Sequence, residues 1–213
     1  MKYSETGFRQ FYKQFVAVPV TERTKQALEG FPGYEDANYI VTYGYYDRDA
    51  GLTLEVLCGA RFLNGKVQYA IGNDSISSTI RINNVEDDEC YLIKDDGTLS
   101  KEHMKKTEKL SAYDVSQDIE NTRTMPFLDA SRDKVFIDDV LVYLMKDGLK
   151  NEGCYTRITG LGEHCLVGEL LNEPVQNFGC HKGDKISFFV TEKRISLSYA
   201  SRIWMKRNKD KFL

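Results

Sequence analysis

Hydrophobic positions along this chain change their spacing near Gly33. Before that point, aromatic residues recur at intervals of three and four, at Phe8, Phe11, Tyr12 and Phe15. This spacing predicts the buried face of a helix that begins near Ser4. A second helix is predicted from Thr21, a favourable N-cap, to a stop at Gly30.

After Gly33 the period changes, and residues 38–46 and 52–62 are rich in Tyr, Val, Ile, Thr and Leu, which favours strands. Strands are predicted over residues 38–46, 52–62, 66–71, 78–82 and 90–93. The pair Asn64-Gly65 predicts a two-residue hairpin turn, because both positions tolerate a positive φ. A charged stretch over residues 100–110 predicts one more helix. Residues 1–110 are therefore expected to form an α+β domain, with N-terminal helices packed on an antiparallel meander sheet.

The second half of the chain reads as a small β domain. Residues 111–134 are polar and weakly periodic, which indicates a connecting segment. Four strands are predicted after it, over residues 140–146, 154–159, 165–171 and 185–191. The last residues alternate from Ile195 and then become helix-like near Ile203. We expect residues 135–213 to form an SH3-like or barrel-like antiparallel β domain with a terminal helix.

Three short segments of this β domain carry a family resemblance. They are 156–160 (TRITG), 168–174 (GELLNEP) and 182–184 (KGD). Together they resemble a bacterial domain-of-unknown-function family of the YegJ-like type, over roughly a quarter of the chain. The resemblance implies a strand, a corner and a Gly-Asp turn into a final strand. It also implies an immunity or partner-binding role without a common catalytic residue.

This chain departs from the family pattern at Glu163-His164-Cys165 and after the Gly-Asp strand. Turn chemistry explains the motif residues without any appeal to a site. Pro174 ends a strand because proline cannot donate to the ladder. Gly183 and Asp184 favour a turn before the next apolar run. We therefore expect these residues to have structural roles.

Composition excludes several classes of protein. The formal net charge of −3 argues against wholesale electrostatic binding of nucleic acid or anionic lipid. No apolar run approaches the roughly 20 residues that a membrane-spanning helix needs. Five cysteines, an odd number, and the lack of an export signal favour reduced thiols and a cytoplasmic location.

No catalytic, cofactor or metal site is expected. Candidate zinc ligands gather in sequence at Cys154, His164, Cys165, Cys180 and His181. They lack Cys-x-x-Cys spacing, and neighbouring residues of a strand point to opposite faces. Neither a phosphate-binding glycine loop nor a GxSxG nucleophile motif occurs. The remaining histidine, His103, is expected to be solvated on a charged helix.

Two charged segments are the candidate partner-binding residues. The acidic run Glu86, Asp87, Asp88 and Glu89 could meet a basic partner such as a nuclease toxin. The basic tail, with Arg202, Trp204, Lys206 and Arg207, could meet phosphates and stack on a base. A solvated loop and a solvated helix end explain the same residues without any partner.

The sequence therefore favours a bacterial protein that is not an enzyme. We expect a protein-binding module of the immunity or regulatory kind, whose partner is a toxin-like or regulatory protein. One alternative is an enzyme whose cysteine- or carboxylate-centred pocket the spacing does not reveal. Another is weak nucleic-acid binding through the basic tail.

Overall fold

The structure is a computed structural model that describes residues 1–63, 66–191 and 196–199. The chain divides into two compact units, unit 1 (Met1–Asp114) and unit 2 (Val115–Leu213). Residues 111–134, expected as a connecting segment, are shared between them. No helix in the described part of the chain has the length and apolar character needed to cross a membrane.

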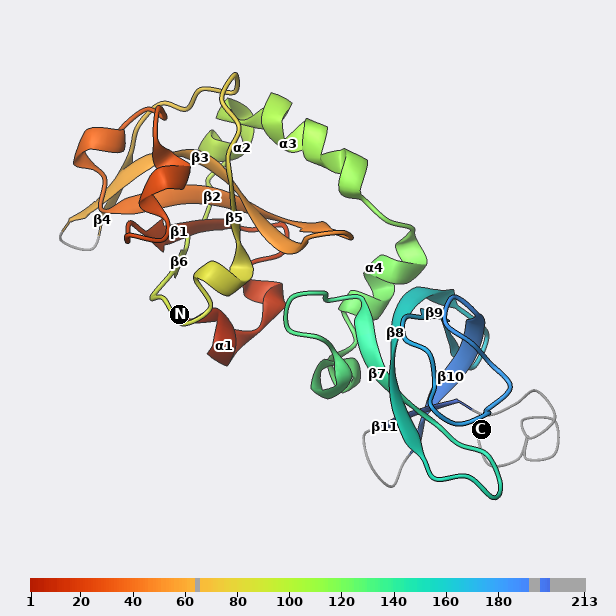
Figure 1. Ribbon diagram of the computed structural model, residues 1–213. Helices are drawn as coiled ribbons and strands as arrows, with labels where there is room; N and C mark the ends of the chain where they lie inside the picture. Colours follow the sequence, from red (N-terminus) through yellow and green to blue (C-terminus); the bar gives the residue numbers. More distant parts are fainter. Residues whose placement is uncertain (64–65, 192–195, 200–213) are drawn as a thin grey trace. The chain divides into compact units, whose positions relative to one another are not determined.

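Unit 1 is built on a six-stranded sheet in which all paired strands run antiparallel. The strands are β1 (Phe15–Pro19), β2 (Tyr39–Asp47), β3 (Gly51–Leu63), β4 (Lys66–Tyr69), β5 (Thr79–Arg81) and β6 (Tyr91–Leu92). Their order is β4-β3-β2-β1-β6, and β5 pairs with β3 (Figure 1). The strands predicted after Gly33 are confirmed. The Asn64-Gly65 turn lies outside the described residues.

The helix predicted from Ser4 is wrong, because the chain turns twice within it. The segment contains only α1 (Tyr3–Thr6) and the 3-10 turn η1 (Phe8–Gln10), and then β1 begins. Gly7 has a φ of 73° and Lys13 a φ of 56°, both outside the helical region. Phe8 and Phe11 are nevertheless buried. Their spacing therefore identified residues of the core correctly but predicted the wrong secondary structure for them.

Hydrogen bonds to β2 replace those of the expected helix. The Lys13 N–H donates to the Gly44 carbonyl at 2.8 Å, and the Gly44 N–H donates to the Gln14 carbonyl at 3.0 Å. A Cβ on Gly44 would lie 1.9 Å from the Phe11 carbonyl oxygen. Only glycine therefore lets this turn approach the strand so closely.

The helix predicted from Thr21 is also wrong, since the structure has only the 3-10 turn η2 (Lys25–Leu28). Thr21 does not act as an N-cap acceptor. Its N–H donates to the Thr24 hydroxyl at 2.8 Å, and the Thr24 hydroxyl donates to the Pro19 carbonyl at 2.8 Å. Two more 3-10 turns follow, η3 (Tyr34–Asp36) and η4 (Ile82–Asn84). The N-terminal half is therefore mostly strands.

The helix predicted over residues 100–110 is divided into α2 (Thr98–Glu102) and α3 (Met104–Leu110), followed by η5 (Ser111–Tyr113). Figure 1 shows α2 and α3 along one side of the sheet. Leu99 packs into a cluster with Phe15, Val41 and Cys58. Lys106 reaches from α3 to the Val56 carbonyl at 2.7 Å and to the buried Glu55 carboxylate at 3.3 Å. This face of the sheet is therefore partly covered by helices.

Unit 2 is a closed barrel preceded by a short helix. Its elements are α4 (Gln117–Arg123), η6 (Pro126–Ser131), β7 (Asp139–Leu144), β8 (Glu152–Leu161), β9 (Leu166–Leu170), β10 (Lys185–Thr191) and β11 (Ser196–Tyr199). The ring runs β10-β11-β7-β8-β9. The four predicted strands and a barrel-like form are confirmed, whereas the expected terminal helix lies outside the described residues.

The barrel is not purely antiparallel, because β11 pairs with β7 in parallel. Five strands that each reverse the direction of the previous one leave the first and the last running the same way. Closing such a ring therefore requires one parallel pair. Its core is the buried cluster of Val140, Val142, Ile158, Leu170 and Phe188 with their neighbours.

Candidate functional site

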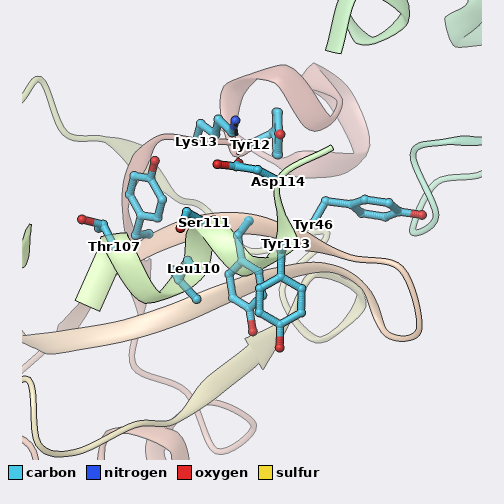
Figure 2. A pocket seen from close by; sticks show the side chains of 10 residues that line it. Tyr12, Lys13, Tyr46, Thr107, Leu110, Ser111, Tyr113 and Asp114 are labelled. Atoms are coloured by element: carbon cyan, nitrogen blue, oxygen red, sulfur yellow. Dashed lines mark ion pairs between the residues drawn. The ribbon is translucent and has the colours of Figure 1, made fainter. Parts of the chain in front are cut away.

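A pocket with walls of tyrosine lies in unit 1, where β2, α3 and the turn before β1 meet. We call it the tyrosine pocket. Its tyrosines are Tyr12, Tyr43, Tyr45, Tyr46 and Tyr113. Thr107, Leu110, Ser111, Lys13 and Asp114 complete the lining. Figure 2 shows Lys13 and Asp114 together at one end, whereas the Tyr46 ring is directed away from them.

An ion pair stands at the rim of this pocket. The Lys13 Nζ lies 3.0 Å from Asp114 Oδ1, and the two side chains are 42% and 52% exposed. The same Nζ lies 5.4 Å from the centre of the Tyr12 ring, within the range of a cation–π contact. The pocket therefore already places a cation against both an aromatic face and a carboxylate.

The backbone at Lys13 is strained. In the described ranges it is the only non-glycine residue with a positive φ, a conformation that costs about 1–3 kcal/mol. The hydrogen bonds between this turn and Gly44 hold it in place. This held backbone conformation positions the Lys13 side chain next to Asp114.

The tyrosines supply flat aromatic surface and hydroxyl groups. The Tyr45 and Tyr113 rings lie 4.8 Å apart at 48°. Burial raises the pKa of Tyr43 and, more strongly, that of Tyr45, so neither phenol is a base near neutral pH. The pocket volume is about 160 Å³. That is below the roughly 300–1,000 Å³ of a drug-sized ligand site, and suits a single side chain.

Four of the five cysteines are buried in the structure. Burial raises the pKa of Cys58 and Cys90 to about 12, and it also raises the pKa of Cys154 and Cys180. Cys165 is half-buried at the tip of the β8–β9 hairpin. In the residues that the structure describes, no three histidine, cysteine or acidic side chains are placed to hold a metal ion.

Two histidine rings are within hydrogen-bond distance of a carboxylate, and the third, His164, is an exposed ring near Glu163. The His181 Nδ1 lies 2.7 Å from Glu173, and the His164 Nε2 lies 3.9 Å from Glu163. The expectation that His103 is solvated is wrong, because its side chain is only 1% exposed, with Nδ1 3.2 Å from Asp74. The break between α2 and α3 turns this ring inward. Gly72 leaves room for it, since a Cβ there would lie 1.8 Å from the ring.

The residues that carry the family resemblance fasten one loop of unit 2. Asn172 Oδ1 accepts the Tyr155 N–H, and Glu173 Oε2 accepts the Lys182 N–H, both at 2.8 Å. Asp184 Oδ2 accepts the His181 N–H at 2.8 Å. Gly183 has a φ of 88° in the turn that precedes β10. The turn predicted at Gly183 and Asp184 is present, whereas β9 ends at Leu170, four residues before Pro174.

The acidic run already has partners within unit 1. Glu89 contacts the amino group of Met1, and Asp88 pairs with Arg23 at 2.8 Å. Asp87 accepts the Ser4 hydroxyl at 2.7 Å, whereas Glu86 contributes only its carbonyl, to the Ser4 N–H. A partner would have to displace these contacts. The other predicted partner-binding residues, Arg202, Trp204, Lys206 and Arg207, lie outside the described residues.

Sequence reasoning did not identify the tyrosine pocket. Tyr43 and Tyr45 alternate along a predicted strand, which marks one face of a sheet. No local pattern links Lys13 to Asp114, because the two residues are far apart in the sequence of unit 1 although their side chains are in contact. Comparison with known proteins adds no assignment: no family model, curated protein or solved structure matches this chain.

Proposed function

We propose that this chain is a non-catalytic protein-binding module, of the immunity or regulatory kind, that takes a basic side chain of its partner into the tyrosine pocket. The observation that carries this proposal is the half-exposed Lys13–Asp114 ion pair among tyrosine rings. The tyrosine pocket is small, burial raises the pKa of its Tyr43 and Tyr45, and one carboxylate stands at its rim.

A basic occupant suits this chemistry. Tyrosine faces attract cations, and a guanidinium can stack on a ring while it pairs with a carboxylate. Lys13 occupies such a position from within the chain. An exposed ion pair is worth only about 0–1 kcal/mol, so an arginine of the partner can replace Lys13 beside Asp114 at little cost.

A protein partner suits the composition of the lining. Tyrosine and serine supply contact area and adaptable hydrogen bonds at recognition surfaces. The volume of about 160 Å³ admits one side chain rather than a whole cofactor.

The enzyme alternative has less support. A thiol nucleophile needs a lowered pKa, and burial raises the pKa of four of the five cysteines. A general base needs a hydroxyl or thiol within hydrogen-bond reach. In the described part of the chain the partners of the histidine rings are carboxylates, and no hydroxyl or thiol lies within hydrogen-bond distance of a ring.

The test is an NMR titration of the full chain with Nα-acetyl-arginine methylamide. The citrulline analogue, which has the same shape without the charge, is the control ligand. We expect saturable shifts at Lys13, Tyr113 and Asp114 with arginine only. Asp114→Asn should abolish them, whereas Lys13→Ala should strengthen binding because it removes the competing cation.

Asp118→Asn is the matched variant, since it removes an exposed carboxylate in α4 and should change nothing. Equal shifts with arginine and citrulline, or an unchanged affinity in Asp114→Asn, would contradict the proposal. Catalytic turnover that requires Tyr45 or Asp114 would replace it with the enzyme alternative.

A further inference from the structure

Arg81 belongs to the same row of side chains as Tyr45, a wall of the tyrosine pocket. Tyr45 of β2 lies directly opposite Thr53 of β3, and Thr53 lies directly opposite Arg81 of β5. Residues directly opposite each other in an antiparallel pair point to the same face of the sheet. Two strand spacings separate the Cα atoms of Tyr45 and Arg81 by about 10 Å. Arg81 is therefore on the face that carries the tyrosine pocket.

The Lys13–Asp114 ion pair lies on the other side of β2 from Arg81. The turn that carries Lys13 bonds to the edge of β2 that faces β1, since β1 begins two residues later. Arg81 lies beyond the opposite edge, where β3 and β5 follow. Between them the Tyr113 ring packs on Tyr45, with centroids 4.8 Å apart. An aromatic surface therefore has a carboxylate at one end and an arginine at the other.

The orientation of the two tyrosines agrees with this order. Figure 2 shows the Tyr113 ring directed away from Lys13 and Asp114. Burial is the main cause of the raised pKa of Tyr45, and the charge of Arg81 is among those that act on its hydroxyl. This influence fits the register that places Arg81 in the row of Tyr45.

One part of the Arg81 guanidinium is held, and the rest is open. Its Nη1 donates to the Thr53 hydroxyl at 2.5 Å. The same Nη1 lies 3.9 Å from Asp47 Oδ2, beyond hydrogen-bond distance, and the other Asp47 oxygen accepts the Asp49 N–H. In the part of the chain that the structure describes, Nε and Nη2 of Arg81 have no partner, and the side chain is 40% exposed. This edge of the guanidinium is available to a carboxylate, which it matches in two-point geometry.

The two ends of this surface favour opposite charges. In the proposed function Asp114 pairs with a basic side chain, whereas Arg81 suits an acidic one. In an extended segment, residues two apart point to the same side, with Cα atoms roughly 7 Å from each other. Long side chains such as those of arginine and glutamate extend over the remaining distance. A segment of mixed charge therefore fits better than a purely basic one.

We propose that the partner segment carries an acidic residue two positions from its basic residue, and that Arg81 binds the carboxylate of this acidic residue. The inference rests on the proposed function, because the basic residue in the tyrosine pocket sets the position of the segment. Arg81 then determines specificity, since it attracts a segment of mixed charge and repels a purely basic one.

The probes are two five-residue peptides with arginine in second place, either glutamate or glutamine in fourth place, and alanine elsewhere. Isothermal titration of the full chain gives the Kd of each. We expect the glutamate peptide to bind at least ~5-fold more tightly, because only its carboxylate pairs with Arg81. In an NMR titration the glutamate peptide should shift the Nε–H signal of Arg81, and the glutamine peptide should not.

Variants of the arginine test the same contact. Arg81→Gln should make the two Kd values equal. Arg81→Lys keeps the charge without the planar fork, so it should retain part of the preference for glutamate. Arg61→Gln is the matched control, since it removes an arginine of similar exposure that pairs with Asp36, and the preference should persist in full. Unchanged urea midpoints should show that each variant is folded.

The outcomes separate this inference from the proposed function. Equal Kd values for the two peptides, both lost in Asp114→Asn, would overturn the inference and leave the proposed function standing. A preference for glutamate that persists in Arg81→Gln would place the acidic contact elsewhere, and would also overturn the inference. If neither peptide binds, the proposed function is wrong, and the role of Arg81 is wrong with it.

Discussion

The sheets of the two units end differently. In unit 2 the described strands form a ring, because β11 joins β10 to β7. In unit 1 the sheet stops, with β4 and β6 as its edges. A closed barrel satisfies its own backbone hydrogen bonds and offers nothing to an added strand. An open sheet keeps that capacity, and both contacts that we propose for a partner lie in unit 1.

The sequence signals are distributed the other way. The motif segments 156–160, 168–174 and 182–184 lie in unit 2, where Asn172 accepts the Tyr155 N–H of β8, and Glu173 and Asp184 accept N–H groups of the loop before β10. A sequence motif can therefore indicate a turn that needs particular side chains to accept backbone N–H groups, rather than a binding or catalytic site. The predictions below test whether unit 2 is the rigid unit and unit 1 the adaptable one.

The largest effect is expected from Arg123 in unit 2. Its guanidinium binds both oxygens of the buried Asp138 carboxylate, at 2.9 and 2.7 Å. Arg123→Met leaves that carboxylate buried without its cation, which should lower the free energy of unfolding by about 3–5 kcal/mol. Urea unfolding, followed by hydrogen exchange of the barrel amides, measures the loss.

Arg157→Met is the matched control. Arg157 pairs with Asp139 in the same two-point manner but is 24% exposed, so its loss should cost less. If the two variants lose equal stability, burial does not make the Arg123–Asp138 pair between α4 and the barrel more stabilising than the exposed pair.

A smaller effect is expected from Gly44 in unit 1. In Gly44→Ala the new Cβ would lie 1.9 Å from the Phe11 carbonyl oxygen, so the turn that carries Lys13 must move. The cost should be about 1–3 kcal/mol, with a loss of arginine binding. Gly160→Ala in β8 meets nothing within 4 Å and should change stability by no more than about 0.5 kcal/mol. Equal urea midpoints for the two variants would show that the turn moves freely.

The smallest effect is expected at His181 in unit 2. Its hydrogen bond to Glu173 raises the pKa of His181 above its ordinary value of 6.5. This contact therefore stabilises the folded state fully below pH 6.5, and the stabilisation is lost as the pH rises through the raised pKa. The Lys182 N–H lowers the pKa of Glu173, so the carboxylate keeps its charge down to below pH 4.5.

An NMR titration checks this prediction. Glu173→Gln should return the pKa of His181 toward 6.5. Glu163→Gln, beside His164, should leave it where it is. An unchanged His181 pKa in Glu173→Gln would mean that the contact seen in the structure does not persist in solution.

Sequence reasoning succeeded where the pattern is local. The high content of Tyr, Val, Ile, Thr and Leu over residues 38–46 and 52–62 predicted β2 and β3, because such side chains pack well in the buried strands of a sheet. It failed for the residues before Gly33. Aromatic residues at helical spacing are buried equally well by two turns that pack on Gly44, more than twenty residues further on.

The site could not be predicted for the same reason. Tyr43 and Tyr45 were visible as alternating tyrosines of a strand. The left-handed backbone of Lys13 and its approach to Asp114 depend on how α3 and η5 cross the sheet. These features depend on contacts between residues far apart in the sequence, which the spacing of residues along the chain does not predict.

The parallel pair of β11 and β7 also sets an order of events during synthesis. The ladders of unit 1 need nothing beyond Leu92, so they can form while the rest of the chain is still being translated. In unit 2, β7 pairs at Val142 with Leu197, and must wait until translation has passed Leu197. Until then one side of β7 stays unpaired, which makes the nascent barrel the stage most exposed to aggregation.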